Sequence, residues 1–193
     1  FAKQVAAFLK GSGIKLAVVA NFPHGGSELP PVLQEIEHSL EAGAQEIDLV
    51  FPYQAFLAGE HAPSLNFVKQ CKAAAGLTTL KVILETSALS DLNLIAEATQ
   101  MVVMAGADFV KTSTGKLPQG ATLEAAAVIL LTLKKLIPNF NRTLGFKAAG
   151  GIQDPQQAAQ YLSLAKNIMG LTWPTPQTFR LGASQLLAKL TVV

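Results

Sequence analysis

Two lysines lie in segments whose residue types and spacing could support covalent chemistry on a carbonyl compound. Lys111 stands in FVKTSTGK (109–116) and Lys147 in LGFKAAGGIQDP (144–155). Side chains of a β-strand alternate between its two faces, so Phe109 and Lys111 would share a face. A lysine that faces a closed interior loses solvation, which favours its neutral, nucleophilic form. For either lysine alone, a structural ion pair is the competing interpretation.

The two lysines together are more informative than either one. If Lys111 and Lys147 lie on adjacent strands, about 4.8 Å apart, their ammonium groups could come close enough to repel each other. One of the two would then lose its proton more readily, as a lysine that forms an imine must. The pair therefore predicts an amine that attacks a carbonyl carbon.

Asp48 is a carboxylate in the middle of the apolar segment EIDLVFPY (46–53). Burying it unpaired would be unfavourable. Opposite two lysines, however, it could stay ionised and move protons as a general acid and base. A structural ion pair is again the alternative.

Glycine-containing segments follow three successive strands and could bind a phosphate through backbone N–H groups. A glycine doublet alone is weakly diagnostic, because turns use glycine freely. The loops after the last strands of a (β/α) barrel are nevertheless the usual phosphate site of that fold. The predicted phosphate ligands are Gly115, Lys116, Gly150, Gly151, Gly182 and Ser184.

Strands and helices that alternate along the chain would position these residues. Amphipathic segments of helical length, such as 30–43, 92–107 and 123–136, separate short β-like runs. The repeat of roughly 25 to 35 residues is typical of βαβ units with a parallel sheet. We predict strands at 14–20, 46–51, 80–85, 107–112 and 143–148, and a weaker one at 165–170.

Residues at the predicted helix ends agree with this interpretation. Gly43 and Gly106 follow two of the helical runs and would terminate them. Asp154 is a good N-cap, and Pro155 suits the first position of a helix.

The fold class follows from polar residues in or after almost every strand, namely Asn21, Asp48, Glu85, Lys111 and Lys147. A barrel collects all these strand ends around one pocket, whereas an open sheet has its site at one switch point. We therefore predict an α/β protein with a TIM (β/α)8-type barrel, and one partial barrel domain over residues 1–193. A full barrel has eight strands and about 250 residues, so the first one to two βα units are expected to be missing from this sequence.

Composition narrows the range of partners. The 15 basic and 13 acidic residues are scattered singly, so no basic stripe for nucleic acid is present. No apolar run reaches the roughly 18 residues of a membrane span, and no signal-peptide pattern opens the chain, which favours a cytoplasmic location. Cys71 is the single cysteine, and the three histidines have no ligand spacing, so we expect neither a disulfide nor a metal site.

Six motifs make the sequence resemble the deoxyribose-phosphate aldolase family (DeoC family) over essentially its whole length. They are NFPHG (21–25), EIDLVFPY (46–53), LKVILET (80–86), AGADFVKTSTGK (105–116), GFKAAGGI (145–152) and FRLGAS (179–184). The resemblance implies a cofactor-free class I aldolase that reversibly cleaves 2-deoxyribose 5-phosphate into glyceraldehyde 3-phosphate and acetaldehyde. The implied partner is thus a small phosphosugar.

The same resemblance implies a role for each site residue. Lys111 would form the imine, Lys147 would make that lysine easier to deprotonate, and Asp48 with a water would move the protons. Phosphate would bind at the six positions predicted above. The sequence departs from the family at Ala148, where proline is common, and at Gln185, where a second serine is common. The family's first two strands and its C-terminal tail are also absent.

Two other interpretations remain open from the sequence. One is a different phosphosugar barrel, an isomerase or epimerase, in which the lysines hold phosphate and form no imine. The other is a truncated, catalytically impaired barrel that associates with a partner or with a second copy across its open edges. A homo-oligomer is compatible with each of these interpretations.

Overall fold

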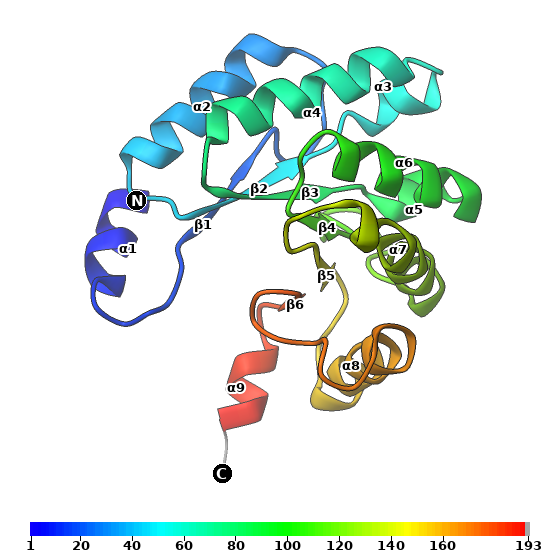
Figure 1. Cartoon of the computed structure of the whole chain (residues 1–193). Coiled ribbons are helices and arrows are strands. Elements are labelled where there is room, and N and C mark those ends of the chain that lie inside the picture. The colour runs from blue at the N-terminus through cyan, green and yellow to red at the C-terminus, as the bar shows by residue number, and fades with distance from the viewer. Residues whose placement is uncertain (192–193) are drawn as a thin grey trace.

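The computed structural model describes residues 1–191 and has one parallel sheet at its centre. Each of six strands is hydrogen-bonded to the next one along the chain, so the sheet order is the sequence order. The sheet curves into part of a barrel, with β1 and β6 at its two edges (Figure 1). The strands are β1 (Ala17–Ala20), β2 (Glu46–Val50), β3 (Thr79–Ile83), β4 (Phe109–Lys111), β5 (Gly145–Ala149) and β6 (Phe179–Gly182).

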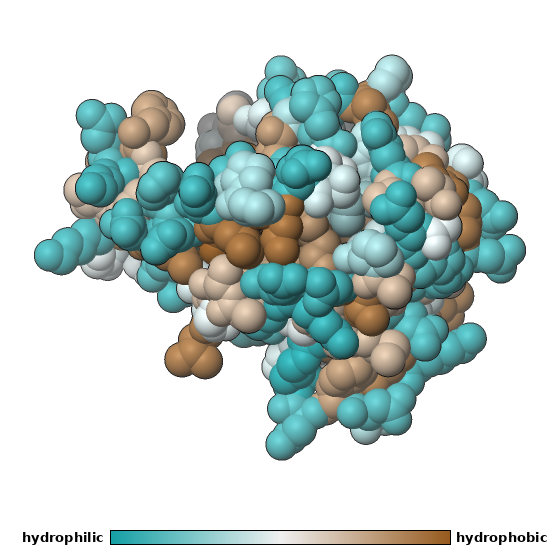
Figure 2. Space-filling model, turned by 90° about the horizontal axis from the view of Figure 1, so that it is seen from above, coloured by the Kyte–Doolittle hydropathy of each residue, from teal (hydrophilic) through white to brown (hydrophobic). Residues whose placement is uncertain are grey.

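Helices follow the outer side of this curved sheet. Helices α2, α4, α6, α7 and α8 lie there in chain order, each in contact with the next (Figure 1). Seen from above, hydrophilic side chains predominate, with smaller hydrophobic areas between them (Figure 2). The helices are α1 (Ala2–Leu9), α2 (Leu29–Glu41), α3 (Tyr53–Leu57), α4 (His61–Ala75), α5 (Thr86–Leu89), α6 (Leu92–Met104), α7 (Leu123–Leu136), η1 (Ile137–Asn139), α8 (Pro155–Met169) and α9 (Leu186–Thr191).

The two faces of the sheet have opposite chemistry. The face toward the helices is apolar and fully buried, with Ile47, Leu49, Leu80, Val82, Val110 and Phe146. On the inner face, Asp48 is in register with Lys81, and Lys111 is in register with Lys147. Register partners in a parallel sheet point to the same side. The inner face therefore carries the charged residues, and the outer face forms the core.

The fold class and most of the elements are as predicted. The first five strands overlap the predicted runs, and the alternation of parallel strands with helices is confirmed. Gly43 and Gly106 have positive φ just after α2 and α6, as expected of helix stops. The side chain of Asp154 accepts a hydrogen bond from the Gln157 N–H at the start of α8, which confirms the cap.

The predicted sixth strand was wrong. Residues 165–170 form the end of α8, which runs to Met169 and stops before Gly170 at φ 108°. Ala158, Tyr161 and Ala165 recur at helical spacing and are buried, so the helix gains more by continuing than a strand would gain. The actual sixth strand is only four residues long and contains Arg180, which hid it from a search for apolar runs.

Cys71 is buried in α4, and burial raises the pKa of its thiol to about 12. It is therefore a packing residue. Within residues 1–191, no helix is long and apolar enough to cross a membrane. No group of three or more His, Cys, Asp or Glu side chains in the same range is placed to hold a metal ion.

Candidate active site

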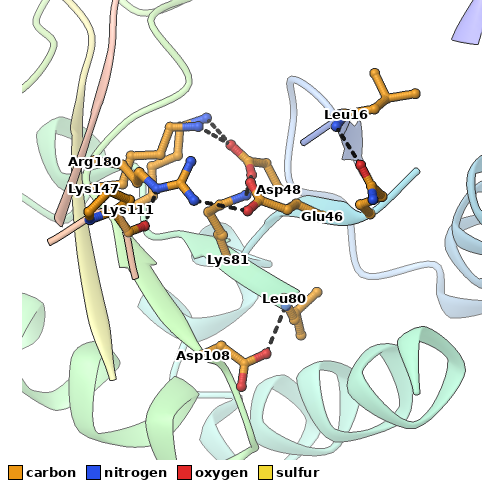
Figure 3. A network of polar contacts seen from close by, with 11 residues as sticks. Leu16, Glu46, Asp48, Leu80, Lys81, Asp108, Lys111, Lys147 and Arg180 are labelled. Carbon is orange, nitrogen blue, oxygen red and sulfur yellow. Dashed lines mark hydrogen bonds and ion pairs between the residues drawn. The ribbon is translucent and has the colours of Figure 1, made fainter. Parts of the chain in front are cut away.

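Asp48 on β2 is the centre of a buried group of charges and is only 3% exposed. Its Oδ2 accepts hydrogen bonds from Lys111 Nζ on β4 at 2.9 Å and from Lys147 Nζ on β5 at 2.7 Å. Its Oδ1 accepts one from Lys81 Nζ on β3 at 2.8 Å. Figure 3 shows the lysines converging on this carboxylate. The three residues predicted to be catalytic thus lie in direct contact.

The surrounding lysines determine the charge of Asp48. Burial by itself would raise the pKa of this carboxyl, but Lys111, Lys147 and Lys81 outweigh it. They hold the pKa of Asp48 well below its usual value. Asp48 is therefore a carboxylate throughout the neutral range and can accept a proton only as a transient step.

Lys147 is perturbed in a way that matters for amine chemistry. Burial lowers its pKa, the Asp48 carboxylate partly opposes that effect, and the positive charge of Lys111 lowers the pKa further. The net result is a pKa below that of an ordinary lysine. Lys147 therefore loses its proton more readily than a lysine in water.

Lys111 also lines a cavity of about 380 Å³ at the C-terminal ends of β4, β5 and β6. Such a volume suits a small metabolite. All six positions predicted to bind phosphate line this same cavity, namely Gly115, Lys116, Gly150, Gly151, Gly182 and Ser184. The structure therefore brings the predicted phosphate ligands beside the lysine that was predicted to form the imine.

Close packing of glycines shapes the rim of this cavity. Gly115, Gly150 and Gly151 all have positive φ, which favours glycine. A Cβ on Gly120 would lie 2.4 Å from the carbonyl carbon and oxygen of Gly150, and Ala121 N–H donates to that oxygen at 3.0 Å. The loops after β4 and β5 are thus in backbone contact.

Three charged residues around Asp48 were not singled out from the sequence. Lys81 also contacts Glu46 at 2.7 Å, and Glu46 contacts Arg180 on β6 at 3.2 Å. The signal was present, because Lys81 interrupts an apolar strand as Lys111 does. Glu46 is two residues before Asp48 and so shares its face.

Glu85, which follows β3, is a further residue that orders the site. It is 1% exposed and has the left-handed backbone conformation. Its carboxylate accepts hydrogen bonds from the Thr114 N–H at 3.2 Å and from the Thr114 hydroxyl. Thr114 directly precedes Gly115 and Lys116, so Glu85 fixes the start of a loop that lines the cavity.

Solved aldolases have the same arrangement of elements. A protein from Coccidioides immitis, assigned as a deoxyribose-phosphate aldolase, is 26% identical with a TM-score of 0.81, over 95% of this chain and 66% of its own. One from Toxoplasma gondii ME49, with the same assignment, is 25% identical with a TM-score of 0.86, over 97% and 78%. The tetrameric deoxyribose phosphate aldolase from Aeropyrum pernix is 26% identical with a TM-score of 0.69, over 97% and 71%.

The fold and these neighbours define an aldolase of the TIM-barrel type, of which the described residues form six strands. The profile of the DeoC/LacD family of aldolases matches residues 2–188. The chain therefore belongs to the DeoC/LacD aldolase family. It spans 66% to 78% of the length of the three solved proteins named above.

Proposed function

We propose that this protein is a class I aldolase that cleaves 2-deoxy-D-ribose 5-phosphate into D-glyceraldehyde 3-phosphate and acetaldehyde. The observation that carries the proposal is the contact of Lys111 and Lys147 with one oxygen of Asp48, at 2.9 and 2.7 Å. Asp48 binds three lysines, and one of them, Lys111, lines the cavity, which suits proton exchange between an amine and a carboxylate at this site.

In this proposal the neutral amine of Lys111 attacks C1 of the open-chain sugar. Loss of water then gives a protonated imine. Asp48, acting through a water, takes the proton of the C3 hydroxyl, and the C2–C3 bond breaks. Its electron pair moves into an enamine on Lys111, and glyceraldehyde 3-phosphate leaves. Protonation of the enamine at C2 and addition of water release acetaldehyde and regenerate the amine.

The phosphate of the sugar would bind at the glycine-rich rim of the cavity. Lys116 supplies a positive charge there, and Gly150 and Gly151, both at positive φ, form a turn whose backbone N–H groups would bind the phosphate. Ser184 adds a hydroxyl from the segment after β6. Binding at this rim would place the other end of a five-carbon sugar toward Lys111.

Reductive trapping tests this proposal. The protein is incubated with acetaldehyde and borohydride, digested, and mapped by mass spectrometry. We expect an ethyl group on Lys111 in the wild type. The matched control is Lys135→Leu, which removes an exposed lysine of α7 and should leave the adduct unchanged.

Two outcomes would contradict the proposal. Absence of an adduct would mean that Lys111 does not form an imine, and would favour a barrel in which the lysines only bind phosphate. An adduct on Lys147 in place of Lys111 would exchange the roles of the two lysines. Conversion of 2-deoxyribose 5-phosphate, followed by coupled oxidation of the aldehyde product, then tests the substrate itself.

A further inference from the structure

We propose that Lys81 is a positioning residue of this site, which holds the Asp48 carboxylate in the orientation that serves Lys111 and Lys147. The inference rests on the proposed aldolase function and gives a role to a residue of the motif LKVILET (80–86) that does not line the cavity. Lys81 does not touch substrate in this account. It acts through Asp48.

The two carboxylate oxygens of Asp48 bind different lysines. Lys81 binds Oδ1 at 2.8 Å, while Lys111 and Lys147 both bind Oδ2. A carboxylate that is held at one oxygen cannot turn about its terminal torsion without losing that bond. The proton-accepting oxygen is therefore kept directed at the two lysines that flank it.

Lys81 is a buried side chain. It is 1% exposed and is among the largest fully buried side chains of the described chain. Its Nζ lies between two carboxylates, at 2.8 Å from Asp48 and 2.7 Å from Glu46. Replacing a buried ion pair with apolar side chains is often neutral or stabilising, so an ion pair at this depth is a poor device for stability alone.

Glu46 links Lys81 to Arg180. Glu46 is buried, and Arg180 of β6 contacts its other oxygen at 3.2 Å (Figure 3). This chain of contacts runs from β6 to β2 to β3 and surrounds Lys81, which is buried. Glu46 thus places a second negative charge against the Lys81 ammonium.

Charge gives Lys81 a second effect that can be measured. Burial tends to raise the pKa of Asp48, and Lys81 lowers it together with Lys111 and Lys147. Without Lys81, the pKa of Asp48 should rise. A residue that only fills space would not produce that change.

The test compares Lys81→Met with Lys72→Met. Lys72 is also bound to a single aspartate, Asp108, but it lies in α4 outside the cluster around Asp48. We expect Lys81→Met still to trap acetaldehyde on Lys111, while kcat falls at least about tenfold and KM changes less than about threefold. The carboxyl ¹³C signal of Asp48 should titrate at higher pH than in the wild type. Lys72→Met should change none of these three measurements.

If Lys81→Met fails to fold, Lys81→Gln carries the same test, because glutamine can bond to a carboxylate without bearing charge. Asp48 should again titrate at higher pH, with a smaller loss of kcat. An unchanged titration and kcat in the folded variant would overturn the role of Lys81. Absence of the adduct in the wild type would instead reject the aldolase function, so the two failures are distinguishable.

Discussion

Two aspartates of this protein each bind more than one cation, and their surroundings distinguish the proposed active-site cluster from a structural one. Asp48 contacts Lys81, Lys111 and Lys147 and is 3% exposed. Asp108, just before β4, contacts Lys72 and Arg142, and its side chain is 25% exposed. Asp48 has three cationic partners and Asp108 has two, but the other contacts of these cations differ.

The cations around Asp108 also donate hydrogen bonds to backbone carbonyls. Lys72 also donates to the Thr78 carbonyl, and Arg142 donates to the carbonyls of Ala107 and Val103. Asp108 itself accepts from the Leu80 N–H at 2.9 Å. These bonds join helix ends to strand starts. Within the described residues, the Lys111 ammonium bonds to Asp48 alone and lines the cavity, which fits the proposed chemistry.

The largest contrast should come from the lysines themselves. Lys111→Leu is expected to abolish turnover, because no other amine at that place can form the imine. Lys147→Leu should nearly abolish it, since the cluster then loses one of its proton carriers. Steady-state conversion of 2-deoxyribose 5-phosphate measures both. Comparable losses in Lys135→Leu would show that these roles are wrongly assigned.

A matched pair of aspartate variants tests the comparison directly. Asp48→Asn should lower kcat by about 10²- to 10⁴-fold, as expected for loss of a general acid and base. It should also lower the unfolding free energy by about 3 to 5 kcal/mol, because Lys81, Lys111 and Lys147 lose the carboxylate that they share. Asp108→Asn should lose about 1 to 3 kcal/mol of stability but keep kcat near wild type. Urea unfolding and initial rates give the four values.

Acid should weaken the protein through Asp48. Its pKa is lowered in the folded state from the usual 3.8, so the group adds stability above that pH and loses it as the pH falls toward the folded value. The stability difference between wild type and Asp48→Asn should therefore shrink as the pH drops below about 4. Urea unfolding across the acid range measures this. A constant difference would show that Asp48 is not held ionised by its lysines.

The smallest effect is expected from a charge outside both clusters. Lys116 is exposed and lines the cavity. Lys116→Gln should raise KM for the phosphorylated sugar by about tenfold and leave kcat nearly unchanged, with less difference at high salt. Lys166→Gln on α8 is the control. An equal effect on a substrate without phosphate would argue against phosphate binding at Lys116.

Much of the fold could be read from the sequence, because parallel βα units leave a strong periodic signal. Gly43, Gly106 and Asp154 mark helix ends by local chemistry that needs no tertiary partner. β6 was not predicted from the sequence, because a short edge strand with Arg180 at its second position has little hydrophobic pattern. The last turn of α8 contains apolar residues, and this short apolar run was therefore predicted to be a strand.

The sequence predicted the candidate site less completely than the fold, because Lys81, Glu46 and Arg180 were not identified. Lys81 stands in a motif, as Lys111 and Lys147 do, but its role depends on its contacts with two carboxylates of the neighbouring strand. That relation depends on the register between β2 and β3, which no single segment encodes. The contact from Arg180 to Glu46 spans even more of the chain and required the curvature of the sheet.

The backbone contact between the loops after β4 and β5 has a consequence for anyone who wishes to alter substrate choice. A side chain at Gly120 would clash with the backbone of Gly150, so a larger residue at this contact in one loop would require the other loop to move. A library that randomises one of these loops would return mostly damaged proteins. One that varies both together, and keeps the two glycines, would sample new acceptor shapes while leaving Lys111 in place.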